Sequence, residues 1–252
     1  MYIKCNWVSH DKSFIIVKKY HSMRAMPDNP KIRERRKPRR EFSSVSQEEI
    51  NRRLKAERIQ RQLMDNWRAG DWYITLTFST STVPKTEDEA KAVLEKFKRS
   101  LRALFRRRGK ELLYISIIEN IRGRGRCHVH MIIPALDAED RKTLARIWPH
   151  GHVNVALYGG EAMDAYRTAQ YFVKLDAKET SSHVMTSRNL IQNEPEKEVV
   201  SRAQTYLDKM TVPKGYRLVK PLSISGFTHE GYPYQKAVFE RIEHIDQKRG
   251  GP

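Results

Sequence analysis

Two histidines one residue apart are the first side chains in this sequence that could do chemistry. His128 and His130 lie in the run Cys127–Ile133, whose alternate positions are apolar. Side chains alternate between the two faces of a β-strand, so the two imidazoles are expected on one face, one strand repeat apart. Two imidazoles in that arrangement suit a divalent metal ion. The alternative interpretation is a pair of histidines on a solvated strand face.

Glu119 is the candidate for a third ligand of the same site. It ends a predicted strand, Leu112–Glu119, that precedes the histidine strand across the short basic, glycine-containing turn Arg122–Arg126. Two strands joined in this way form a hairpin, which would bring the carboxylate beside the two imidazoles. The alternative is an ordinary exposed acid at the end of a strand.

A tyrosine and a lysine three residues apart form the second chemical element. Tyr171 and Lys174 share one face of a predicted helix, beside its apolar stripe. A phenol attacks phosphate well only if its pKa falls or its oxyanion is stabilised, and a lysine and a metal ion do both. The alternative is an amphipathic tyrosine at the edge of the core.

Two further groups compete for these roles. Tyr166 is a possible second nucleophile, but its spacing of five residues places it about 140° around the helix from Tyr171. His150 and His152 form another histidine pair. Its middle residue is Gly151 at a turn, which favours the start of a strand over a metal site.

The elements that must position these residues can be read from periodicity. Alternating or apolar runs predict four strands, and 3.6-residue periodicity with terminal signals predicts three helices. The strands are 72–78, 112–119, 127–133 and 151–157, and the helices are 86–108, 137–147 and 161–176. The order predicts an α+β fold, with a central antiparallel sheet of about five strands and flanking helices.

The flanking regions are predicted from composition. Residues 1–45 contain three prolines and a basic run, and are expected to form a partly disordered basic arm. Residues 46–70 are expected to form a charged helix that starts with Ser46 as N-cap and Glu49 in a capping box. The core spans 71–180, and 181–252 is a C-terminal extension packed on or beside it. That extension is predicted to hold a helix at 196–209 and late strands around 216–219 and 235–241.

Charge indicates a polyanionic partner. The chain has 252 residues, with 48 Lys and Arg against 30 Asp and Glu, a formal net charge of +18. Seven of the ten residues 31–40 are basic, and 96–110 holds eight basic residues and no acid. Such blocks bind phosphates by releasing counterions. The alternative is a solvated charged surface.

Other classes are excluded by composition. No apolar run approaches the roughly 20 residues of a membrane span. Cys5 and Cys127 lie too far apart for a disulfide framework or a zinc knuckle. The N-terminus resembles no export signal, so a cytoplasmic, non-secreted protein without membrane contact is expected.

Three motifs in a fixed order carry a family resemblance. Thr75–Phe78, His128–His130 and Tyr171 with Lys174 follow one another at spacings of tens of residues. This pattern resembles the HUH endonucleases, specifically the rolling-circle replication initiators of small plasmids and phages. The resemblance covers 72–176 and, more faintly, 186–191. Conjugative relaxases differ, because their tyrosine precedes the histidines, of which they usually have three.

The resemblance implies a mechanism. His128 and His130, with Glu119 as third ligand, would hold Mg²⁺ or Mn²⁺ against the scissile phosphate. Tyr171 would attack, leaving a 5′-phosphotyrosine and a free 3′-hydroxyl, while Lys174 positions the phosphate or stabilises charge. A second transesterification would rejoin the strand.

The resemblance also implies partners. Tyr166 would act as a second nucleophile if this were a two-tyrosine member. Arg122, Arg124 and Arg126 would contact DNA near the scissile phosphate. The substrate would be single-stranded or hairpin origin DNA. A host polymerase would extend the 3′-end, and a host helicase would unwind the duplex, because the sequence has no P-loop motif.

Three alternative functions remain at this stage. A single-tyrosine transposase would use the same chemistry, although such chains are usually shorter. A non-catalytic nucleic-acid-binding protein would use the basic surface alone. A metal-dependent hydrolytic nuclease would use water and form no covalent product. The sequence leaves open the origin, the host, the choice of metal and the oligomeric state.

Overall fold

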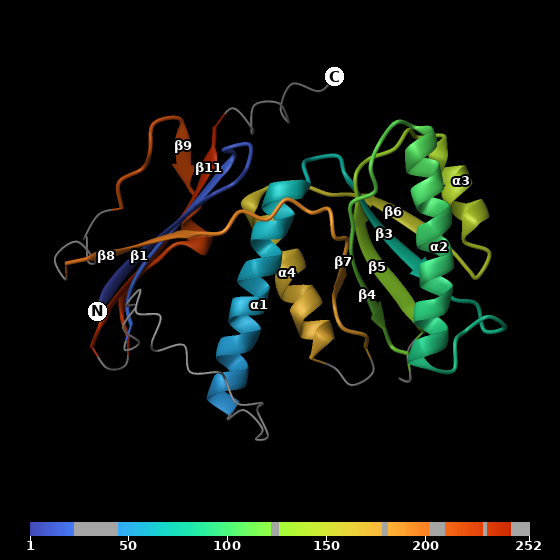
Figure 1. Cartoon of the computed structure of the whole chain (residues 1–252), viewed down its shortest axis with the longest axis horizontal. Coiled ribbons are helices and arrows are strands. Elements are labelled where there is room, and N and C mark those ends of the chain that lie inside the picture. Colours follow the sequence, from blue (N-terminus) through green and yellow to red (C-terminus); the bar gives the residue numbers. More distant parts are fainter. Residues whose placement is uncertain (23–44, 122–125, 178–180, 202–209, 229–230, 243–252) are drawn as a thin grey trace, which may run out of the picture. The chain divides into compact units, whose positions relative to one another are not determined.

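The computed structural model describes residues 1–22, 45–121, 126–177, 181–201, 210–228 and 231–242 (Figure 1). The chain divides into two compact units. Unit 1 comprises Met1–Lys55 and Asn193–Pro252, and unit 2 comprises Ala56–Gln192. None of the helices in the described part combines the length and the hydropathy of a membrane span.

Unit 1 is built on an antiparallel sheet of six strands. Its order is β10-β11-β2-β1-β8, and β9 also pairs with β11. A short 3₁₀ helix, η2 (Lys220–Leu222), separates β9 from β10. The strands are β1 (Tyr2–Val8), β2 (Phe14–His21), β8 (Glu196–Val200), β9 (Tyr216–Leu218), β10 (Ile224–Phe227) and β11 (Pro233–Arg241).

This sheet corrects two predictions. Residues 2–21 do not form an arm: they form β1 and β2, and β2 pairs with both β1 and β11. The predicted helix at 196–209 is also wrong where the structure describes it, because residues 196–200 form β8 against β1. The basic run 31–40 lies outside the described residues. The late strands around 216–219 and 235–241 are confirmed as β9 and β11.

Unit 2 contains the predicted central sheet. Five antiparallel strands lie in the order β6-β3-β5-β4-β7, which confirms the α+β class and the sheet of about five strands. The strands are β3 (Trp72–Thr77), β4 (Ile115–Glu119), β5 (His128–Ile133), β6 (Val153–Leu157) and β7 (Met185–Thr186). Residues 181–192 therefore belong to this unit, since β7 pairs with β4, whereas the described residues from 193 onward belong to unit 1.

Four α-helices accompany the sheets in the described part of the chain. They are α1 (Val45–Asn66), α2 (Glu87–Arg107), α3 (Asp140–Ile147) and α4 (Ala162–Asp176). The predicted helices are confirmed, with shifted starts. Helix α1 begins at Val45, so Ser46 lies inside it, and α3 begins three residues after Asp137. Of the apolar stripe predicted for α1, Ile59 and Leu63 are buried, whereas Ile50 and Leu54 are exposed.

The core of unit 2 lies between the sheet and α2. Alternate residues of β3 and β5 point to this face and pack with one face of α2 and with α3 (Figure 1). They include Trp72, Ile74 and Leu76 from β3, Val129 and Met131 from β5, Leu94, Leu101 and Phe105 from α2, and Leu144 from α3. Helix α2 fits this place because its N-cap Thr86 accepts a hydrogen bond from the Glu89 amide, and its charges match the helix dipole at both ends.

Helix α4 serves the opposite face of the sheet. Its entry is fixed by a turn in which Gly160 has φ +75°, and a Cβ there would lie 2.2 Å from the Ala69 amide nitrogen. The Glu161 amide then donates to the Asp164 carboxylate, which starts the helix. Phe172 is buried, while Tyr171 on the neighbouring side is 37% exposed. The Tyr171 side chain is therefore free to reach toward the histidine face of the sheet.

Candidate active site

Strand register brings the polar residues of three strands onto one face. In β5, His128 pairs with Thr77 of β3 and with Glu119 of β4. His130 pairs with Thr75 in the same way. Because side chains alternate along each strand, these residues share the face opposite the core. The hairpin predicted from sequence is therefore formed, with Glu119 directly across from His128.

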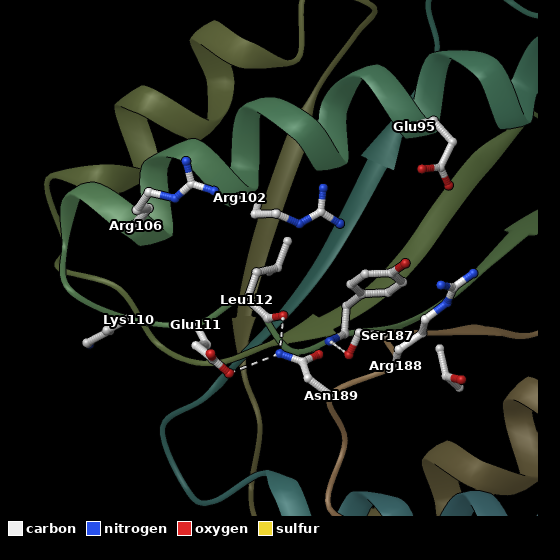
Figure 2. Close-up of a pocket in the computed structure, with 11 residues that line it drawn as sticks. Glu95, Arg102, Arg106, Lys110, Glu111, Leu112, Ser187, Arg188 and Asn189 are labelled. Atoms are coloured by element: carbon white, nitrogen blue, oxygen red, sulfur yellow. Dashed lines mark hydrogen bonds between the residues drawn. The ribbon is translucent and has the colours of Figure 1, made fainter.

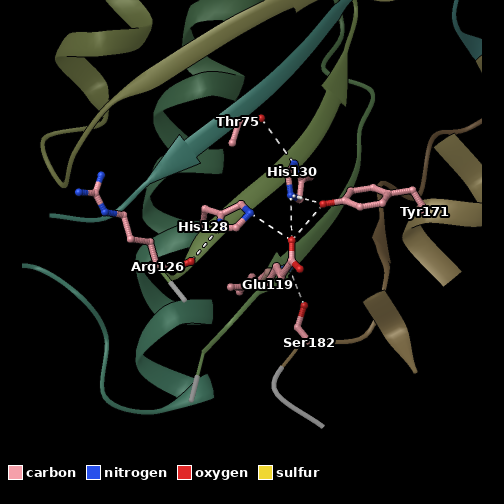
Figure 3. A network of polar contacts seen from close by, with 8 residues as sticks. Thr75, Glu119, Arg126, His128, His130, Tyr171 and Ser182 are labelled. Carbon is pink, nitrogen blue, oxygen red and sulfur yellow. Dashed lines mark hydrogen bonds and ion pairs between the residues drawn. The ribbon is translucent and has the colours of Figure 1, made fainter. Parts of the chain in front are cut away.

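The carboxylate of Glu119 lies between the two imidazoles (Figure 3). Its Oε2 is 3.1 Å from His128 Nε2 and 3.3 Å from His130 Nε2. The possible ligand atoms of the three residues lie within 4.8 Å of one another, and among the described residues they form the one such cluster of three. Glu119 and His130 are buried, and His128 is partly buried.

His128 is oriented as a metal ligand. Its Nδ1 lies 2.7 Å from the backbone carbonyl oxygen of Arg126. A carbonyl only accepts, so Nδ1 carries the proton and donates it, and the lone pair of the neutral ring lies on Nε2. That lone pair faces a carboxylate oxygen at 3.1 Å. Two acceptors at this distance need a proton or a cation between them, so the donor set fits a divalent cation.

His130 is held in its neutral form. Burial lowers its pKa, and the neighbouring His128 lowers it further, against the opposing effect of Glu119. Its Nδ1 lies 3.5 Å from Thr75 Oγ1, which orients the ring from β3. A neutral imidazole keeps a lone pair for a metal ion. The site thus presents two imidazole nitrogens and one carboxylate oxygen.

Tyr171 completes the polar network from α4. Its hydroxyl donates to Glu119 Oε2 at 3.0 Å and lies 3.1 Å from His130 Nε2 (Figure 3). Burial and the hydrogen bond to Glu119 raise its pKa to about 12. The phenol is therefore protonated at neutral pH in the metal-free site. An attack by its oxygen requires a positive charge close to that oxygen.

Other predicted residues lie outside this network. Tyr166 is partly buried on α4 and makes no hydrogen bond with any described residue. Lys174 is exposed one turn beyond Tyr171, and within the described part of the chain its ammonium has no hydrogen-bond or ion-pair partner. Arg122 and Arg124 fall outside the described residues. His150 packs near Trp148 and Phe78, away from the metal-ligand cluster.

A hollow beside His128 contains the remaining predicted DNA-binding residue. Arg126 is exposed and lines a cavity of about 440 Å³ together with Thr77, Ser79, Thr80 and His152. Its backbone carbonyl orients His128, so its guanidinium leaves the chain two residues from the metal-ligand cluster. This places hydroxyl groups and a cation next to the site.

Sequence reasoning gave no role to several residues around the histidines. The Tyr73 and Phe172 rings lie 6.4 Å apart, and the Tyr73 ring centroid is 5.9 Å from that of His130. Thr75 was part of a motif, but its contact with His130 was not inferred. The signal was the alternation of residues 72–78, which places Tyr73, Thr75 and Thr77 on the face of the histidines. The strand order that makes them neighbours of β5 is not visible in that pattern.

Comparison with known proteins adds an independent observation. Residues 71–180 match the model of a family of replication-associated proteins, the ORF2 type. The match covers less than half of the chain but includes every residue of the cluster from Thr75 to Tyr171. Its bounds are also those predicted for the core. No curated protein and no solved structure shows significant similarity to the chain.

Proposed function

We propose that this chain initiates DNA replication by nicking and rejoining one DNA strand through a covalent phosphotyrosine. One observation carries the proposal: the Tyr171 hydroxyl lies 3.0 Å from a carboxylate that also faces two imidazoles. The similarity of residues 71–180 to a replication-associated family favours replication over transposition. The family match and the metal-ligand cluster meet in the same strands.

The chain's own residues account for the chemistry. Tyr171 Oη attacks the scissile phosphorus, and the new P–O bond to tyrosine forms as the bond to the 3′-oxygen breaks. The phenolic proton is lost, and the departing 3′-oxygen takes up a proton. One phosphodiester replaces another, so the second transesterification can rejoin the strand without a further energy source.

Three side chains would hold a divalent cation in this site. His128 and His130 offer Nε2, and Glu119 offers Oε2. When bound, such a cation polarises a non-bridging phosphate oxygen and supplies the positive charge that favours the phenolate of Tyr171. Lys174, on the same helix face one turn away, is proposed to stabilise the charge on the phosphate. Arg126 is proposed to hold the strand beside the scissile position.

The product fits a replication initiator. Cleavage leaves a 3′-hydroxyl that a polymerase can extend, while the 5′-end stays on the protein. The sequence has no P-loop motif, so unwinding is assigned to a separate helicase. The proposed substrate is single-stranded or hairpin DNA at a replication origin.

The test is covalent trapping on a denaturing gel. Single-stranded DNA carrying a candidate origin is incubated with the full chain and Mn²⁺. A protein–DNA band is expected, and it should disappear in Tyr171→Phe and with EDTA. Tyr166→Phe is the matched control, since it removes a hydroxyl from the same helix, and it should retain the band. DNA affinity should be unchanged in Tyr171→Phe.

Other outcomes select the alternatives. A band that survives Tyr171→Phe but not Tyr166→Phe would identify Tyr166 as the nucleophile. Cleavage without a covalent band would indicate hydrolysis by water. DNA binding with neither cleavage nor band, across several hairpins, would indicate a non-catalytic binding protein.

A further inference from the structure

A basic groove lies in unit 2 along α2, on the side of the sheet away from the histidines. It has a volume of about 720 Å³ and is formed by α2, the segment that follows it, and the segment after β7 (Figure 2). We call it the arginine groove. Its lining includes Glu95, Arg102, Arg106, Lys110, Glu111, Tyr114, Arg188 and Asn189.

The carboxylates in the groove already have partners. Glu95 Oε1 accepts a hydrogen bond from the buried ammonium of Lys98 at 2.9 Å. Glu111 Oε2 accepts from the Asn189 amide at 3.2 Å (Figure 2). Within the described part of the chain, neither is bonded to an arginine. The acidic groups therefore do not neutralise the guanidinium groups that line the same groove.

The arginines lack partners. Arg102, Arg106 and Arg188 are exposed, and none makes a hydrogen bond or ion pair with another described residue. Lys110 donates to the Ala135 carbonyl, which leaves its charge uncompensated. Arg102 and Arg106 stand four residues apart on one helix face, where like charges repel. Three guanidiniums and an ammonium thus line one concave surface.

Such a surface fits phosphate. A guanidinium presents a planar fork of donors that matches a phosphate in two hydrogen bonds. A concave surface of one sign concentrates the field that attracts a polyanion. Helix α2 packs on the core face of the sheet, whereas the nucleophile lies on the other face. A phosphate in the groove is therefore not the scissile one.

We propose that the arginine groove binds the sugar–phosphate backbone of DNA at a distance from the cleavage position. This inference rests on the proposed function for the identity of the polyanion. The groove supplies affinity without reading sequence, because backbone contacts carry no base information. Arg102, Arg106 and Arg188 are the residues that contact phosphate.

The experiment measures DNA binding as a function of salt. The full chain carries Arg102→Gln, Arg106→Gln and Arg188→Gln together, and EDTA is present so that no cleavage occurs. Fluorescence anisotropy gives Kd for a duplex and a single-stranded oligonucleotide between about 50 and 200 mM salt. Each neutralised phosphate contributes about 0.9 to the slope of log Kd against log salt on duplex DNA, and about 0.7 on a single strand.

The expected result is a slope that falls by about 2 to 3 on at least one of the two DNA forms. The affected form is the one that occupies the groove. The matched control removes the same charge from the same helix outside the groove, as Lys96→Gln, Arg99→Gln and Arg107→Gln. It should change the slope by less than about 1. Circular dichroism checks that both variants fold.

Two results would overturn the inference. One is an unchanged slope on both DNA forms. The other is an equal fall in the control, which would mean that overall charge and not the groove is responsible. Failure of the nicking proposal is read separately, because it appears as a missing covalent band in wild-type protein and does not alter the binding slope.

Discussion

His128 and His130 are oriented by different partners, and this difference has consequences for the metal. A backbone carbonyl fixes the tautomer of His128, while burial keeps His130 neutral. The carboxylate of Glu119 completes a set of two nitrogen donors and one oxygen donor. Imidazole suits first-row transition metals, whereas Mg²⁺ prefers sites made of oxygen atoms and water.

The donor set predicts a preference for Mn²⁺ over Mg²⁺. The Mn²⁺ concentration that gives half-maximal covalent product should be at least about tenfold lower than that of Mg²⁺, because two of the three ligands are nitrogens. A titration of each metal against adduct yield measures it. In Glu119→Gln both metals should bind more weakly. Equal half-maximal concentrations for the two metals would contradict the proposed ligand set.

Tyr171 shows what sequence could and could not reveal at the scale of a residue. Its position on a helix face with Lys174 was predicted from spacing, and the structure places its hydroxyl beside Glu119 and His130. The raised pKa was not predicted, because it arises from burial and a hydrogen bond across 52 residues of chain. Lys174 has the predicted spacing but stays outside the network.

At the scale of elements, the strands of the five-stranded sheet were predicted well because their patterns are strong. Residues 72–78 alternate, and the histidine strand has an apolar face. Strand β8 was mistaken for a helix, because Glu196–Val200 is rich in charged residues that also favour helices. It is an edge strand, where charge is common, and Lys4 of β1 bonds Glu198 at 2.6 Å.

Gly151 lies just before β6, against the end of β3, and carries an element-scale prediction. A Cβ at this position would lie 2.1 Å from the Thr77 carbonyl oxygen, so an added methyl group must push the strands apart. Gly151→Ala should lower the free energy of unfolding by about 1 to 3 kcal/mol. Chemical denaturation followed by circular dichroism measures the change.

The control for Gly151 is a glycine with open space. At Gly226 in β10, a Cβ would meet nothing within 4 Å. Gly226→Ala should therefore change stability by no more than about 0.5 kcal/mol. If Gly151→Ala were equally neutral, the close approach of β6 to β3 at this point would be incorrect.

At the scale of the whole molecule, the chain returns to its beginning. Strands β1 and β2 form one sheet with β8 and β11, which lie about 200 residues later. Sequence reasoning treated residues 1–45 and 181–252 as separate appendages, because each is short, charged and weakly patterned. Pairing between distant segments leaves no local signal, so a second sheet was not predicted.

A truncation tests this pairing. In a chain that ends at Gln192, β1 lacks β8 and β2 lacks β11. A two-stranded hairpin is marginally stable alone, so residues 2–21 should become sensitive to trypsin at Lys18 and Lys19. Limited proteolysis with mass spectrometry compares the shortened and the full chain. Equal protection of this segment in both would contradict the six-stranded sheet.

The central claim is that Tyr171 forms the covalent bond to DNA, and peptide mapping tests it most directly. Trypsin cleaves after Arg167 and Lys174, which isolates Tyr171 as the one tyrosine of the peptide 168–174, while Tyr166 falls in the preceding peptide. After reaction with origin DNA, nuclease treatment and digestion, mass spectrometry should find a nucleotide on the peptide 168–174. A nucleotide on the peptide that contains Tyr166, or cleaved DNA without any modified peptide, would contradict the account.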